Sequence, residues 1–184
     1  MPVHIPLDTI CVRSGLLCPR CEAKVRSGEY EEWEVDVMKA LLEAGGKLDG
    51  EVRYVKSHRV GEEVYVFLEA PRGLPVWLGQ ELSRILESRV YVVEYSRDLR
   101  RLASNLLHPA RVVGLDYSYL PDGSTLLQVK VDRSPRRGVE ELARKVLGLV
   151  SGVEIVIQAS GQAEAVDARP DKSDIRGALE RIGL

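Results

Sequence analysis

The amino-acid sequence predicts an α+β protein built from two small α/β modules with three-stranded sheets, preceded by a short cysteine-bearing segment. Three observations lead to this prediction. Helical patterns alternate with strand patterns, the order of helices and strands repeats along the chain, and all three cysteines lie within the first 21 residues. The chain has 184 residues, enough to bury a substantial core, and the order of its elements favours two small units over one large domain.

Composition limits the class of protein. Hydrophobic residues make up 45% of the chain, but no apolar run approaches the roughly 20 residues of a membrane helix. The first residues lack the basic region and apolar stretch of a signal peptide. We therefore expect a soluble cytoplasmic protein that does not contact membranes. An odd number of cysteines without a secretion signal points to metal-bound or buried thiols rather than to disulfides.

The first predicted unit, residues 1–28, contains a candidate metal site. Cys18 and Cys21 have the two-residue spacing of a zinc knuckle, in which the turn lets both thiolates face one ion. Cys11 is a candidate third ligand and His4 a candidate fourth, although a partner chain is an alternative source. The competing interpretation is a remnant knuckle whose reduced thiols are buried as small hydrophobic groups.

The second predicted unit, residues 29–95, is the first module. Trp33, Val37 and Leu41 recur at helical spacing and predict a helix over about 30–44. Apolar residues in the strand expected over 62–70 alternate with a mixed set, which predicts one strongly apolar face and one mixed face. The other elements expected here are a strand over 51–58, a helix over 74–88 and a strand over 90–95.

A short helix and a second module follow. Residues 96–111 predict a connector helix with Ser96 as its N-cap and Pro109 beyond its end. Residues 112–158 are expected to form the second module, opened by a hairpin with strands over 111–119 and 125–132. A helix beginning at Ser134-Pro135 and a strand over 153–157 complete it. Residues 159–184 predict a linker and a short helix over 173–182.

The joint between the modules carries a resemblance to a known family. Several segments in order resemble the joint between the tandem KH domains of NusA. They are Tyr95-Ser96-Arg97-Asp98, then Leu107-His108-Pro109-Ala110-Arg111-Val112, then a strand, Asp122-Gly123 and a second strand. The resemblance covers residues 10–158. The arrangement is similar to that of archaeal NusA-like transcription elongation and termination factors. It implies two tandem KH-like modules of the prokaryotic type II, each a three-stranded sheet with helices on one side, the second module being degenerate.

The sequence departs from that family at the loops that grip RNA. KH domains use a Gly-x-x-Gly loop, in which backbone N–H groups approach phosphates because no side chain intervenes. Residues 71–79 include Gly73 and Gly79 but no Gly-x-x-Gly, and residues 133–138 are too short for the family's helix-loop-helix. The resemblance therefore implies the fold more directly than it implies conventional RNA gripping.

Basic residues gather in the second half of the chain. Residues 95–158 hold ten Lys and Arg against seven Asp and Glu, whereas residues 1–94 hold twelve against sixteen. Phosphate neutralisation dominates nucleic-acid affinity, so we expect RNA contact there, unless the arginines are simply solvated. Tyr117 and Tyr119 are candidates for base stacking or for ordinary packing. The expected contacts are Arg97, Arg100, Arg101, Arg111, Arg133, Arg136, Arg137, Arg144 and Lys145.

No motif for catalysis is found, so we expect a protein that is not an enzyme. The resemblance implies an RNA-binding accessory factor in transcription elongation or termination, contacting single-stranded nascent transcript or ribosomal RNA. The alternative is a protein-interaction adapter on RNA polymerase or the ribosome that has lost conventional RNA gripping. Zinc is the only cofactor that the sequence suggests.

Overall fold

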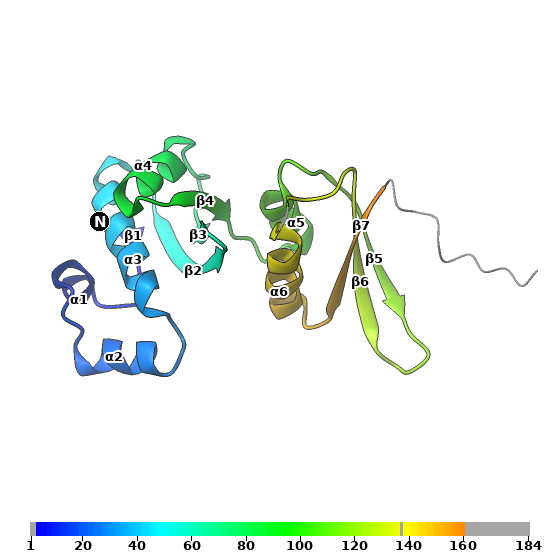
Figure 1. Ribbon diagram of the computed structural model, residues 1–184, viewed down its shortest axis with the longest axis horizontal. Coiled ribbons are helices and arrows are strands. Elements are labelled where there is room, and N and C mark those ends of the chain that lie inside the picture. The colour runs from blue at the N-terminus through cyan, green and yellow to red at the C-terminus, as the bar shows by residue number, and fades with distance from the viewer. Residues whose placement is uncertain (1–2, 137, 161–184) are drawn as a thin grey trace, which may run out of the picture.

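The computed structural model describes residues 3–136 and 138–160, and this part of the chain is α+β, as expected. Its described residues form six α-helices and two small mixed sheets, of four and three strands. Figure 1 shows the two sheets separated by a pair of helices. The helix expected over 173–182 lies outside the described residues. No helix in the described part is long and apolar enough to cross a membrane.

The N-terminal segment is more structured than its sequence predicted. It contains β1 (Val3–His4), α1 (Thr9–Ser14) and α2 (Pro19–Arg26). β1 pairs in parallel with β2 (Val52–Val60), so the first sheet has four strands. The expectation of a three-stranded sheet in the first module is therefore wrong, because the cysteine-bearing segment extends the sheet by one short strand.

The first module contains α3 (Glu32–Ala44), β2, β3 (Glu63–Glu69), α4 (Trp77–Leu86) and β4 (Arg89–Glu94). A short 3-10 helix, η1 (Gly45–Lys47), follows α3. β2 pairs antiparallel with β3, and β3 pairs in parallel with β4. Both α3 and α4 pack on one face of this sheet, where they share a core with Val64, Val66 and Leu68 of β3.

The start of α3 is fixed by a buried carboxylate. Glu34 is fully buried and accepts hydrogen bonds from the backbone N–H of Glu31 (2.8 Å) and of Ser57 (2.8 Å). It also accepts from the hydroxyl of Tyr54 (2.6 Å) and the ammonium of Lys56 (2.7 Å). Since every one of these donors is satisfied by the same side chain, Glu34 joins the first turn of α3 to the bulge in β2.

The second module repeats the order of the first. The helix expected as a connector, α5 (Leu99–Leu107), shares a core with this module and is counted as part of it. The module also contains β5 (Val112–Tyr119), β6 (Thr125–Val131), α6 (Val139–Ser151) and β7 (Glu154–Ala159). β5 pairs antiparallel with β6, and β6 pairs in parallel with β7. The helix-strand-strand-helix-strand order and the strand pairing are thus the same in both modules.

Two expected helix starts are wrong. The N-cap of α5 is Asp98, whose carboxylate accepts a hydrogen bond from the backbone N–H of Arg101 (2.8 Å). Ser96, the expected N-cap, lies two residues before it, and its hydroxyl accepts from the backbone N–H of Asp98 (3.1 Å). α6 begins at Val139 after Gly138, which has a φ of 84°. A helix start at Pro135 is excluded because a turn at that left-handed glycine separates the proline from the helix.

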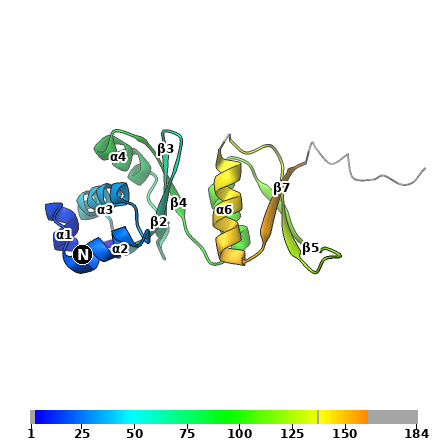
Figure 2. The ribbon, with the colours of Figure 1, turned by 60° about the horizontal axis from the view of Figure 1, so that its bottom comes forward.

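The modules pack as four layers. In order these are α3 with α4, the first sheet, α5 with α6, and the second sheet (Figure 2). Tyr65 and Phe67 of β3 point away from α3 and belong to the core formed by α5, α6, β6 and β7. The first sheet is therefore covered on both faces, and one hydrophobic core includes residues of both modules.

Candidate metal centre and nucleic-acid interface

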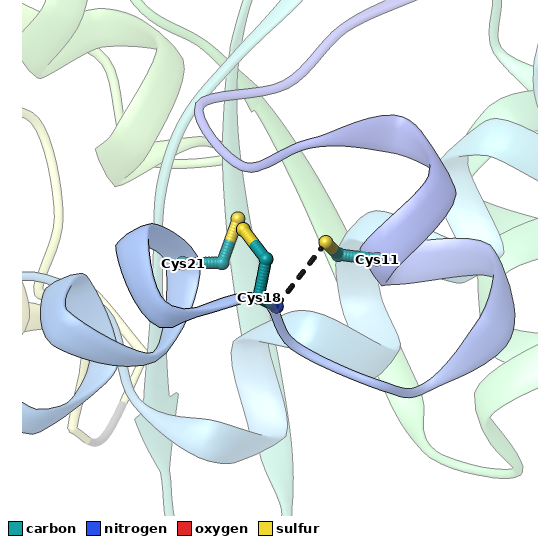
Figure 3. A group of neighbouring side chains, drawn as sticks. All are labelled: Cys11, Cys18 and Cys21. Atoms are coloured by element: carbon teal, nitrogen blue, oxygen red, sulfur yellow. Dashed lines mark hydrogen bonds between the residues drawn. The ribbon is translucent and has the colours of Figure 1, made fainter.

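The three cysteines lie close together between α1 and α2. The sulfur atoms of Cys11, Cys18 and Cys21 all lie within 4.8 Å of one another. Figure 3 shows Cys18 and Cys21 turned toward each other, with the Cys11 sulfur facing them from the other helix. Cys11 and Cys21 are buried, and Cys18 is partly exposed. The cluster therefore opens to solvent on the Cys18 side.

Local structure explains this convergence. Asp8 caps α1, its carboxylate accepting from the backbone N–H of Ile10 (2.8 Å) and of Cys11 (3.3 Å). α1 ends at Gly15, which has a φ of 75° and turns the chain back. Cys18 is the N-cap of α2 and Pro19 its first residue, a position that suits a fixed φ and needs no N–H donor.

Backbone N–H groups point at the sulfurs. The N–H of Cys18 donates to the Cys11 sulfur (3.4 Å), and the N–H of Asp8 donates to the Cys21 sulfur (3.3 Å). The N–H of Cys21 also donates to Cys18, which is the main reason that the pKa of Cys18 is lowered. Donors of this kind orient thiolates that bind a metal.

The pKa of Cys11 moves the other way. Its hydrogen bond from the Cys18 backbone favours the thiolate, but burial and the two neighbouring thiols outweigh that bond, so the pKa of Cys11 is raised. Three thiols this close together do not all ionise readily without a cation. A bound cation supplies the positive charge that the cluster lacks.

His4 is not part of the cluster. It lies on β1 with its side chain exposed, and its Nε2 is 4.0 Å from a carboxylate oxygen of Glu51. Within the described residues, the group that the structure brings together consists of the three cysteines. The described residues therefore bring together three sulfur donors, and a four-coordinate metal would need one further donor.

The donor set fits zinc. Tetrahedral zinc with bonds of about 2.3 Å to sulfur separates its ligand sulfurs by roughly 3.8 Å, which lies within the measured limit of 4.8 Å. Three thiolates favour zinc over hard cations such as Mg²⁺ or Ca²⁺. The spacing in the sequence had indicated these three residues, so the cysteines of the predicted site are confirmed as a cluster able to hold a metal.

The expected RNA contacts fall into two groups in the described part of the chain. Arg101, Arg133 and Arg144 form ion pairs with Glu94, Asp132 and Glu140 respectively. Arg97, Arg100 and Lys145 are exposed, and none of the residues that the structure describes forms an ion pair with them. Arg111 is exposed beside Asp132, which accepts from its backbone N–H (2.8 Å). Unpaired cations are the better candidates for binding phosphate, because they need not first break an ion pair.

Arg136 has a different environment from the one expected. Its guanidinium carbon lies 4.1 Å from the ring centroid of Tyr91 in β4, and its Nε is buried. This side chain therefore joins the loop before α6 to the first module. Arg137 lies outside the described residues.

The two tyrosines of the hairpin are exposed. Tyr117 and Tyr119 are 53% and 82% exposed, so neither is buried packing. They pair across the hairpin with Leu127 and Thr125, on the strand face that continues to Leu115 and Val129. Their exposure is compatible with base stacking or with contact to a protein.

A groove that the sequence did not reveal lies between the modules. It has a volume of about 580 Å³ and is lined from β2, β3, the segment after β4, and α6. His58 is the residue that sequence reasoning missed there, since a single histidine in a strand carries no motif. Only the folded arrangement brings it near Lys145, whose charge helps to lower the pKa of His58 after the larger effect of burial.

The structure thus defines an α+β protein with two modules of one topology and a three-cysteine cluster at its N-terminal side. No family model matches the chain, and no curated protein matches it. One solved structure that it resembles is described as "Crystal structure of APE1850". That chain is 25% identical, with a TM-score of 0.40, over 53% of this chain and 79% of the other.

Proposed function

We propose that this protein is a non-enzymatic RNA-binding factor made of two KH-like modules, acting as NusA-like factors do in transcription elongation or termination. The observation that carries the proposal is the repeated topology. Each module has the helix-strand-strand-helix-strand order, with two helices on one face of its sheet. That arrangement is the one expected of the prokaryotic KH fold.

The charge distribution supports RNA as the ligand. Arg97 and Arg100 lie at the start of α5, on the exposed side, and Lys145 lies on α6. All three are free of ion pairs within the described residues. Because single-stranded RNA carries one phosphate per nucleotide, a few unpaired cations give weak binding that falls steeply as salt is added.

The proposed cofactor is one zinc ion held by Cys11, Cys18 and Cys21. α1 and α2 have only six and eight residues, too short to be stable helices alone. A metal bond to each would hold them together beside α3. We assign the zinc a structural role, since the three sulfurs lie on the side of the first module away from the unpaired cations.

The test is binding of single-stranded RNA, measured by fluorescence anisotropy over a range of salt concentrations. The triple variant R97E/R100E/K145E should weaken binding and flatten the slope of log Kd against log salt by about 2. The control R26E/K39E/R72E makes the same change of charge on α2, α3 and the loop before α4, on the α3 and α4 side of the first sheet, and should bind almost normally.

Two outcomes would reject the proposal. The first is the absence of RNA binding by the parent protein at low salt. The second is equal loss in both triple variants, since this would mean that only net charge matters. Recovery of RNA polymerase or the ribosome on nuclease-treated protein, without RNA binding, would instead favour the protein-interaction adapter.

A further inference from the structure

The two walls of the groove between the modules come from different modules. Val55 and His58 of β2 and Phe67 of β3 form one wall, and Val146, Leu149 and Val150 of α6 form the other. Tyr95 and Arg97 lie where the chain passes from the first module to the second. Since neither module forms both walls, the groove exists only when the two modules are packed together.

Its interior is suited to a flat apolar ring. His58 and Phe67 are in edge-to-face contact, with ring centroids 5.7 Å apart. Phe67 is buried behind this surface, whereas His58 and Tyr95 are partly exposed. Leu149 is 74% exposed on the opposite wall, although it is a large aliphatic residue. A volume of about 580 Å³ is within the usual range for a small ligand or a nucleoside.

The rim of the groove is positive. Lys56 and Arg97 line it, and Lys145 lies close enough to affect the charge of His58. Lys56 forms an ion pair with Glu34, but Arg97 and Lys145 have no ion-pair partner among the described residues. Among the described residues that line the groove, none is a carboxylate. An occupant with an apolar ring and a negative charge is complementary to this surface.

We infer that the groove is a binding site for one nucleotide of single-stranded RNA, with the base between Leu149 and the aromatic wall and a phosphate at Arg97 and Lys145. This inference rests on the proposed RNA-binding function and gives that function a location. His58 has a lowered pKa and is therefore neutral at pH 7, so its ring can pack against a base without adding charge.

The site also differs in location from a Gly-x-x-Gly grip. The loop before α4 ends at Val76, which is 93% exposed, and it belongs to the face of the first sheet that α3 and α4 cover. The groove opens on the other face. A nucleotide bound there needs no glycine-rich loop, so this site would let a chain without such a loop bind RNA.

The experiment compares two exposed apolar residues in the full-length protein, with a fluorescein-labelled oligouridylate as the probe. Leu149→Ser should raise the Kd about tenfold, the usual effect of losing one base contact, and should leave the salt slope unchanged. Val76→Ser is the matched control and should bind as the parent does. Arg97→Ala should lower the magnitude of the salt slope by about 0.7, the value for one phosphate of a single strand.

A second measurement locates the base directly. Photocrosslinking with 4-thiouridine in the same oligonucleotide should attach RNA to peptides containing His58, Phe67 or Tyr95. RNA binding that is unchanged by Leu149→Ser would overturn the assignment of the groove as the nucleotide site while leaving the proposed function intact. Loss of RNA binding in Val76→Ser, with crosslinks in the loop before α4, would do the same. The absence of RNA binding by the parent protein would reject both the groove assignment and the proposed function. If Leu149→Ser instead lost a bound protein partner and kept its RNA affinity, the groove would be a peptide-binding site.

Discussion

The guanidinium of Arg136 lies over the ring of Tyr91, 4.1 Å from the ring centroid, and this contact joins the loop before α6 to the last strand of the first module. Tyr91 in turn stacks on Tyr65, with ring centroids 5.1 Å apart. Gly138 lies next to Val60 in the same region, where an added Cβ would come within 2.5 Å of a methyl carbon. One end of the contact between the modules is thus closely packed, and the groove lies between the same two modules.

Arg136→Ala should destabilise the protein by about 1 kcal/mol, because a partly buried cation–π contact is lost. Urea unfolding followed by circular dichroism measures this change. The control is Arg133→Ala, since Arg133 is exposed and its ion pair with Asp132 should contribute less than about 0.5 kcal/mol. Equal effects of the two substitutions would show that the Tyr91 contact adds no stability.

Glu34→Gln should destabilise the protein by about 3 kcal/mol or more, because it leaves Lys56 without its buried partner and mismatches several donors. The control is Glu32→Gln, two residues earlier on the exposed side of α3, where a change within about 0.5 kcal/mol is expected. Chemical denaturation of both variants gives the comparison. A small effect at Glu34 would mean that the amide satisfies the same donors.

Glu63 should make stability depend on pH in the acid range. Burial alone would raise its pKa, but donation from the hydroxyls of Tyr65 (2.8 Å) and Tyr91 (3.2 Å) outweighs burial, with help from Arg89. The folded pKa therefore lies below the unfolded value near 4.5. The stabilisation is fully present above that value and is lost as the pH falls through the folded pKa.

The measurement is the free energy of unfolding between pH 6 and about pH 3. Glu63→Gln should be less stable than the parent at pH 6, and the difference should shrink as the pH falls. Glu62 is an exposed neighbour in the turn before β3, so Glu62→Gln should have nearly the same free energy of unfolding as the parent over this pH range. A difference that stays constant with pH would contradict the assigned hydrogen bonds.

The cysteine cluster predicts metal content. Protein purified without chelator should carry one zinc ion, and C18S/C21S should carry none and melt at a lower temperature. His4→Ala should keep its zinc, because His4 lies apart from the three sulfurs. Plasma emission spectrometry gives the metal content. Zinc in the double variant, or its loss in His4→Ala, would contradict this assignment.

Much of the fold follows from local patterns. The alternation and helical spacing in residues 29–158 predicted the two modules' helices and strands, since these elements are long enough to show a period. α1 and α2 were missed because six and eight residues give too few turns for a period to appear. The cysteine spacing nevertheless identified the cluster, because ligand spacing in a tight turn is itself a local property.

Features that depend on packing between distant segments could not be predicted from the sequence. β3 was expected to have one mixed face, but Tyr65 and Phe67 are 1% and 2% exposed because the second module covers that face. Arg136 was expected on a basic surface, and nothing in its own loop indicated Tyr91 as a partner. The groove has walls separated by some eighty residues of chain, so no local pattern could reveal it.

The position of Tyr65 and Phe67 in the second core has a consequence for how the protein can be divided. A fragment ending after β4 would keep β3 but uncover both aromatic rings, together with Val93. Such a fragment would present an apolar sheet face to water and tend to aggregate. The two modules therefore form one cooperative unit, which should melt as a single calorimetric transition even though its topology repeats.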